Sequence, residues 1–106
     1  MSSTTAQTSS GQNFDYTYNP SLAPTGGSNV DASRVNAFYI VNAYHDTLYL
    51  YGFTERAYNF QNDNFGKGGA GNDRVRISVQ DSSGTNNANF ATPPEYVTLA
   101  FTLSDL

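Results

Sequence analysis

The spacing of apolar and polar residues between Ser28 and Gly52 predicts one long helix. Ser28 or Asn29 can cap its start, and Gly52 offers a stop at its end. Apolar side chains recur at helical spacing in two stripes that lie almost opposite each other. The first contains Val35, Phe38, Tyr39 and Tyr49 together with Asn42, and the second contains Ala37, Ile40, Val41, Tyr44, Leu48 and Tyr51. A helix that is apolar on two sides is normally enclosed by protein, so we expect a buried helix, although little chain follows to enclose it.

Other segments alternate with the period of a strand. Residues 14–18 read as a short strand or an extended arm that ends at the turn residues of 19–27. Residues 74–80 have the pattern of a half-buried strand, and residues 86–92 that of an edge strand stopped by Pro93 and Pro94. Residues 96–103 form a third β-prone run, and residues 55–64 a short helix or a loop. The expected class is α+β, with one long helix, two or three strands and long loops.

Composition narrows the possible partners. The chain has 106 residues, a formal net charge of -4 and only five Lys and Arg residues, so it lacks the basic surface that nucleic-acid binding needs. It contains no cysteine, which excludes disulfides and thiolate metal sites. No run approaches the roughly 18 to 20 apolar residues of a membrane span. Residues 1–10 have neither a basic start nor an apolar run, so we do not expect them to be a signal peptide.

The one histidine of the chain, His45, is followed by Asp46 on the predicted helix. A catalytic zinc site usually takes three protein ligands, often two His and one Glu, together with a water molecule. One histidine cannot supply that set. We therefore interpret His45 as a structural residue or as a residue that supports a neighbouring site, and Asp46 as its hydrogen-bonding or charge partner. The alternative is that His45 is a metal ligand.

Two polar loops could be mistaken for ligand sites. The stretch Gly66–Gly69 contains a Gly-Lys pair, but a phosphate-binding P-loop needs Ser or Thr after the lysine, where this chain has Gly68. A plain loop is the favoured interpretation. The cluster Asn59, Gln61, Asn62, Asp63 and Asn64 offers oxygen ligands for calcium, but it lacks the spacing of an EF-hand loop. A solvated loop is favoured there too, and calcium binding stays possible and unsupported.

The strongest candidate site is Asn86-Asn87-Ala88 in the predicted edge strand. An edge strand can pair with an extended peptide through main-chain hydrogen bonds that accept almost any sequence. A short amide side chain there can reach one further group of the peptide backbone. The alternative is an ordinary edge strand with Asn-rich turn residues.

These segments together resemble a known family. The motifs are Asn36-Ala37-Phe38-Tyr39, His45-Asp46, Tyr51–Glu55, Asn59-Phe60-Gln61, Asn64–Gly69 and Gln80–Pro94. They resemble the first part of the catalytic domain of the fungalysins, the secreted zinc metalloproteinases of fungi, from about Phe14 to Pro94. The resemblance implies an incomplete thermolysin-like N-terminal subdomain. Nothing in the chain resembles the His-Glu-x-x-His helix that supplies zinc ligands and a catalytic base.

The resemblance also implies roles for individual residues. Asn87 would donate to and accept from the substrate backbone, and Ala88 would offer its carbonyl, with Asn86 and Phe90 beside them in the substrate-binding strand. No catalytic residue and no metal ligand is expected in this chain. The zinc of the parent family would be held elsewhere, and its partner would be a peptide or protein substrate outside the cell. By itself the chain is expected to hydrolyse nothing.

The resemblance divides the chain into three parts. Residues 1–27 are expected to be a flexible lead-in with a short arm, residues 28–95 a partial catalytic domain that forms one wall of the substrate cleft, and residues 96–106 a tail unrelated to the family. The codons of Glu95-Tyr96-Val97 can read GTATGT, a common start of fungal introns, so we hypothesise that this tail is translated intron. The start at Met1, without signal peptide or propeptide, suggests truncation there as well.

Two other functions compete with the protease fragment. The chain could be a non-enzymatic peptide-binding or decoy module that keeps the edge strand, or a small interaction protein unrelated to proteases. The binding module requires the chain to fold alone. Because the predicted helix is apolar on two sides and lacks cover, we expect poor autonomous folding and self-association through exposed apolar surface. We expect no membrane partner.

Overall fold

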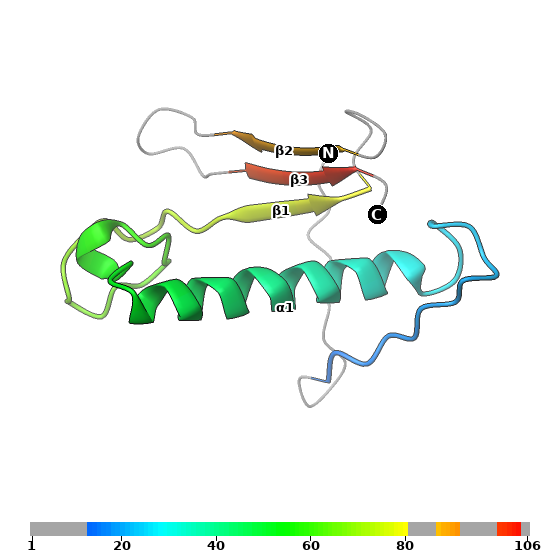
Figure 1. The fold of residues 1–106 in the computed structure, drawn as a ribbon, viewed down its shortest axis with the longest axis horizontal. Helices are drawn as coiled ribbons and strands as arrows, with labels where there is room; N and C mark the ends of the chain where they lie inside the picture. The colour runs from blue at the N-terminus through cyan, green and yellow to red at the C-terminus, as the bar shows by residue number, and fades with distance from the viewer. Residues whose placement is uncertain (1–12, 81–86, 92–99, 105–106) are drawn as a thin grey trace.

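The computed structural model describes residues 13–80, 87–91 and 100–104 (Figure 1). Its elements are helix α1 (Asn29–Leu50), the 3-10 helix η1 (Glu55–Ala57) and strands β1 (Arg76–Val79), β2 (Asn87–Ala91) and β3 (Ala100–Ser104). The long helix and the three predicted strands are confirmed. In the part of the chain that is described, no helix is long and apolar enough to span a membrane.

The two ends of α1 are fixed in different ways. At the start, the Ser28 side chain does not cap the helix; its hydroxyl donates to the Thr17 carbonyl at 2.7 Å. At the end, the Gly52 amide donates to the Tyr49 carbonyl at 3.1 Å and the Phe53 amide to the Leu48 carbonyl at 3.0 Å. These two hydrogen bonds need a residue in the left-handed conformation at position 52, and the φ of Gly52 is 102°. Gly52 therefore ends the helix, as predicted.

Asn29 ties the N-terminal arm to the helix. Its side chain is almost fully buried, at 1% exposure. Its Oδ1 accepts from the Asn19 amide at 2.8 Å, and its Nδ2 donates to the carbonyls of Asn19 and Ala23 at 3.0 and 3.1 Å. A residue considered only as a helix cap thus holds the arm and the helix together.

The three strands form one sheet in the order β1-β3-β2. Strand β3 runs parallel to β1 and antiparallel to β2, with Thr102 paired to Ser78 on one side and to Asn89 on the other. Strands β1 and β2 are therefore the two edges of the sheet. Helix α1 lies beside β1, so β3 and β2 lie progressively farther from it (Figure 1).

The prediction of a buried helix is wrong for this chain. Within α1 only Asn29 and Ala37 are buried, while Tyr39 is 70% exposed and Tyr44 is 65% exposed. One side of α1 contacts β1, and the arm covers a second strip, where the Phe14 ring stacks on Phe38 at 5.7 Å. The rest of the helix surface has no cover among the described residues. The apolar residues that predicted burial are present, but too few elements surround them.

Candidate functional site

Strand β2 carries the predicted substrate-binding residues. It contains Asn87, Ala88 and Phe90, whereas Asn86 lies outside the residues that the structure describes. Among the described strands, β2 pairs with β3 alone and so forms one edge of the sheet, as predicted. Ala88 is exposed and Phe90 is 52% exposed. The position of the strand suits main-chain pairing with an added extended segment.

The structure does not bring His45 and Asp46 together with β2. Both lie on α1, which contacts β1, and β3 separates β1 from β2. The His45 Nδ1 lies 3.1 Å from Asp46 Oδ1, and Nε2 is buried without a hydrogen-bond partner among the described residues. The Asp46 side chain is 82% exposed. The pairing of these two residues, suggested by their adjacency, is confirmed.

The described residues do not fit a zinc site. The chain has one histidine, and its Nδ1 already faces the Asp46 carboxylate. Over residues 13–80, 87–91 and 100–104 there is no group of three or more His, Cys, Asp or Glu side chains that could hold a metal ion. Three convergent protein ligands are the usual minimum for catalytic zinc. We therefore derive no zinc-dependent step from these side chains.

A buried carboxylate, Glu55, organises the region after α1, and sequence reasoning missed it. Glu55 is 4% exposed. The Tyr49 hydroxyl donates to its Oε2 at 2.9 Å, and the Lys67 ammonium lies 3.5 Å from its Oε1. Lys67 also lies 6.0 Å from the centre of the Tyr49 ring. The lysine of the Gly-Lys motif is thus used to neutralise a buried carboxylate, which agrees with the interpretation of a plain loop. Tyr49 and Glu55 are six residues apart, a spacing that does not identify the pair in a sequence.

The Glu55 cluster predicts how stability depends on pH. The hydrogen bond of its own backbone amide lowers the pKa of Glu55 below its ordinary 4.5, and Tyr49 and Lys67 lower it further, while burial acts in the opposite direction. The Glu55 carboxylate raises the pKa of Lys67 above 10.5. Because its pKa is lowered on folding, the Glu55 carboxylate stabilises the fold above pH 4.5. This stabilisation is lost as the pH falls through the folded-state pKa. The lysine contribution is complete below pH 10.5 and is lost as pH rises beyond it.

We expect the urea midpoint of unfolding to fall as the pH drops below about 4.5, the ordinary pKa of Glu55. In Glu55→Gln this fall should be smaller, because the neutral amide has no proton to take up. Asp46→Asn leaves the Glu55 contacts in place and should keep the fall. Circular dichroism at several pH values measures the midpoint. Equal pH dependence in wild type and Glu55→Gln would contradict the role of Glu55.

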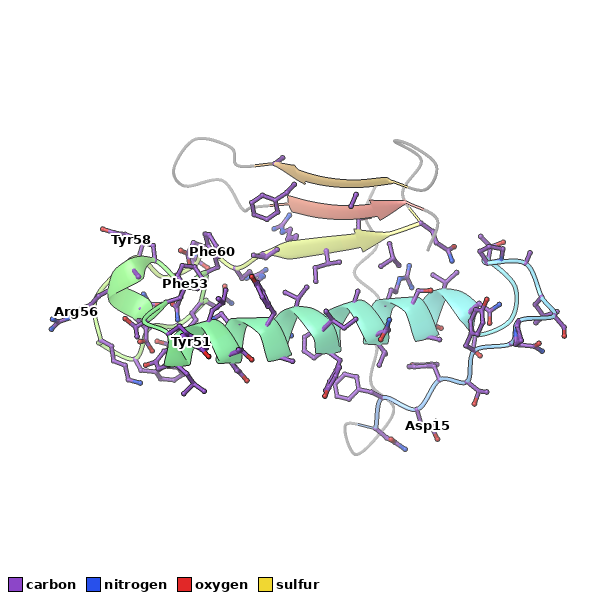
Figure 2. All side chains as sticks on the ribbon, in the orientation of Figure 1. Asp15, Tyr51, Phe53, Arg56, Tyr58 and Phe60 are labelled. Carbon is purple, nitrogen blue, oxygen red and sulfur yellow. The ribbon has the colours of Figure 1, made fainter. Side chains whose placement is uncertain are left out.

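In the polar loop of residues 59–64, three side-chain oxygen atoms accept hydrogen bonds within the protein, whereas Asn59 Oδ1 and Asn64 Oδ1 are buried without a partner among the described residues. Gln61 Oε1 accepts from Asn59 at 2.6 Å, Asn62 Oδ1 accepts from Arg74 at 2.7 Å, and Asp63 Oδ1 accepts from the backbone amide two residues later at 2.8 Å. The Asn64 amide group donates to the carbonyls of residues 68 and 70 at 2.7 and 3.0 Å. These contacts give the loop a structural role, and they do not support the calcium alternative. Figure 2 shows Phe53 and Phe60 at the same end of α1, where their rings meet edge to face at 5.6 Å.

Comparison with known proteins identifies the family. The model of the fungalysin metallopeptidase family (M36) matches residues 1–98. The chain belongs to the fungalysin family. Extracellular metalloproteinase mep of Aspergillus flavus is 58% identical over 82 residues, which are 77% of this chain and 13% of that protein. Extracellular metalloproteinase MEP of Neosartorya fischeri is 54% identical over 87 residues, 82% of this chain and 14% of that protein. The corresponding protein of Pyricularia oryzae is 56% identical over 82 residues.

This fungalysin chain therefore spans about one-seventh of the length of the curated relatives it matches. The family match extends beyond the interval from Phe14 to Pro94 that the motifs indicated, and it ends at residue 98. Strand β3, at Ala100–Ser104, lies outside it. A segment outside the matched range thus provides the middle strand of the sheet, whereas both edge strands and α1 belong to the matched part.

Proposed function

We propose that this chain is part of a secreted zinc-dependent metalloendopeptidase and contributes the strand that binds its peptide substrate. The observation that carries the proposal is the place of β2 at the edge of the sheet in a chain of the fungalysin family. In this proposal α1 and the sheet correspond to an incomplete thermolysin-like N-terminal subdomain, and residues 28–95 form one wall of the substrate cleft. The zinc, its ligands and the catalytic base belong to other parts of the parent enzyme.

The chemistry of an edge strand suits an endopeptidase. A peptide added to β2 would be held in an extended conformation by main-chain hydrogen bonds, which do not depend on the side chains of the substrate. Extended binding exposes the scissile bond, and the enzyme can then accept many sequences. In this proposal the Asn87 amide adds one hydrogen bond to the substrate backbone, and Ala88, Asn86 and Phe90 lie beside it. His45 and Asp46 support the fold and take no direct part.

The contribution of Asn87 is measurable in a chimera in which this chain replaces the matched 82 residues of the A. flavus protein. We expect the chimera to hydrolyse peptides and Asn87→Ala to lower its kcat/KM about fivefold, since one hydrogen bond is worth roughly 1 kcal/mol. Its thermal midpoint should stay nearly unchanged, because in this proposal the Asn87 side chain bonds to the substrate and not to the rest of the fold. Ser21→Ala removes an exposed polar side chain from a turn and is the control.

Three results would contradict the proposal. These are a folded chimera without peptidase activity, an unchanged kcat/KM in Asn87→Ala, and an equal loss in Ser21→Ala. A fourth measurement concerns the chain by itself. We expect the purified 106 residues to hydrolyse no peptide with added zinc, because the described side chains provide no set of three ligands. Hydrolysis that copurifies with the chain and is lost on chelation would overturn this expectation.

The alternative of a non-enzymatic peptide-binding module rests on the same edge strand. It needs β2 to remain available in the isolated chain, where its one neighbour among the described strands is β3. Titration with an unstructured peptide distinguishes the two functions. Saturable shifts of the NMR signals of the β2 amides in the isolated chain, together with no peptidase activity in the chimera, would favour the binding module.

A further inference from the structure

Helix α1 leaves several large apolar side chains exposed, and we call the surface that they form the outer helix face. It is formed by five large side chains with exposures between 53% and 85%: Tyr39, Ile40, Tyr44, Leu50 and Tyr51. Ile40, Tyr44 and Tyr51 fall within about 40° of one another around the helix axis, at 100° per residue. Figure 2 shows Tyr51 at the C-terminal end of α1.

The outer helix face carries no charge. The positions between its large residues are small or uncharged: Ala32, Ser33, Asn36, Ala43 and Thr47. Of the charged residues of α1, Asp31 and Arg34 lie on other sides of the helix and form an ion pair at 3.2 Å, and Asp46 lies at the border of the face. A helix side that meets water normally carries charged and polar residues. Large apolar residues separated by small ones are typical of a packing surface.

A hollow adjoins the outer helix face and makes it uneven. It lies between the N-terminal arm and α1, and its volume is about 640 Å³. Phe14 and Tyr16 line it from the arm, and Phe38, Tyr39 and Ala43 line it from the helix. Tyr39 and Ala43 belong to both surfaces, so the hollow and the face are continuous. Such a surface can receive protruding side chains as well as flat contacts.

We propose that the outer helix face is an internal interface of the parent metalloproteinase, covered there by the remaining part of the same chain. This inference rests on the proposed function. The face lies inside the family match, which ends at residue 98, and more than four-fifths of each relative lies outside the matched segment. The remaining chain is joined covalently to this segment in the relatives, so its local concentration is far higher than that of a second copy. A second copy would be a substitute partner for the isolated chain.

Cysteine accessibility tests the interface without measuring activity. The chain has no cysteine, so Thr47→Cys places a unique thiol at the centre of the outer helix face, and Ser21→Cys places one at an exposed turn. We expect the Thr47→Cys thiol to react with a maleimide at least about 100-fold more slowly in the A. flavus chimera than in the dilute isolated chain, because opening of a packed interface is rare. The Ser21→Cys thiol should react at similar rates in both. Mass spectrometry of the labelled peptide identifies the site.

A second variant pair makes the result independent of labelling. Ile40→Asp should lower the thermal midpoint of the chimera by at least about 3 °C, because it buries a charge. The same change should leave the thermal midpoint of the dilute isolated chain unchanged, and Ser21→Asp should change the midpoint of neither protein.

Fast labelling at Thr47→Cys, or a chimera that tolerates Ile40→Asp, would overturn the inference. If Ile40→Asp then converts a dimer of the isolated chain into a monomer, the occupant is a second copy. A chimera with a protected face but no peptidase activity would contradict the proposed function alone.

Discussion

Gly69→Ala is expected to destabilise the chain by about 3 kcal/mol or more, the largest effect of any single methyl group described here. A Cβ built on Gly69 would overlap the main-chain carbonyl oxygen of Glu55 and would lie 3.1 Å from the Asn64 Nδ2. The φ of Gly69 is +69°, a conformation that costs an L-residue additional energy. The overlapping atom belongs to the backbone, so no side-chain rotation relieves it. The loop must separate from η1, and the Glu55–Lys67 contact is lost with it.

Gly66→Ala is the matched control for this effect. Gly66 has a similar φ of +73°, but an added Cβ would meet nothing within 4 Å. It should therefore cost only the backbone term, roughly 1 to 2 kcal/mol. Urea unfolding followed by circular dichroism gives both values. Equal losses in the two variants would show that the close contact between Gly69 and Glu55 does not exist in solution.

Thr102→Pro is expected to remove the whole sheet. Thr102 lies in the middle of β3, paired to Ser78 on β1 and to Asn89 on β2. Proline has no amide hydrogen and is tolerated in sheets almost only at edges, so in a central strand it breaks a ladder bond and bends the strand. We expect a loss of about 3 kcal/mol. Because β1 and β2 share no bond with each other, both should lose hydrogen-exchange protection together.

Thr102→Val is the control for Thr102→Pro, since valine favours strands and keeps the amide. Hydrogen exchange followed by mass spectrometry over residues 76–79 and 87–91 makes the comparison. The wild type and Thr102→Val should protect both segments, whereas Thr102→Pro should protect neither. Retained protection of β1 in the proline variant would mean that α1 holds this strand without β3.

Local patterns predicted the elements well, because the signals are local. Gly52 ends α1 through a left-handed conformation that glycine adopts without strain, and the alternation at Val75, Ile77 and Val79 predicted the strand that became β1. The edge position of β2 was predicted from Pro93 and Pro94, which follow it. The order of the strands was not predicted. Pairing between segments that are distant in sequence depends on tertiary contacts that no short window contains.

The buried polar residues were harder to predict. Asn29 was considered only as a helix cap, yet its side chain fixes the arm through three hydrogen bonds. Glu55 appeared only as part of a family motif, and its burial depends on Tyr49 and Lys67, which come from either side of it in sequence. The exposure of α1 was missed for the opposite reason. The apolar stripes indicated where contacts form, but they could not indicate that the covering elements are absent from the described part of the chain.

The middle place in the sheet has a consequence for how such a chain can change. The residues of β3 lie outside the family match, whereas the two strands that flank it lie inside. Ladder hydrogen bonds join main-chain atoms, so they hold an inserted strand largely irrespective of its side chains. The place between β1 and β2 can therefore be filled by strands of different sequence. A different β-forming sequence after residue 98 is therefore expected to complete the same sheet without any change in β1 or β2.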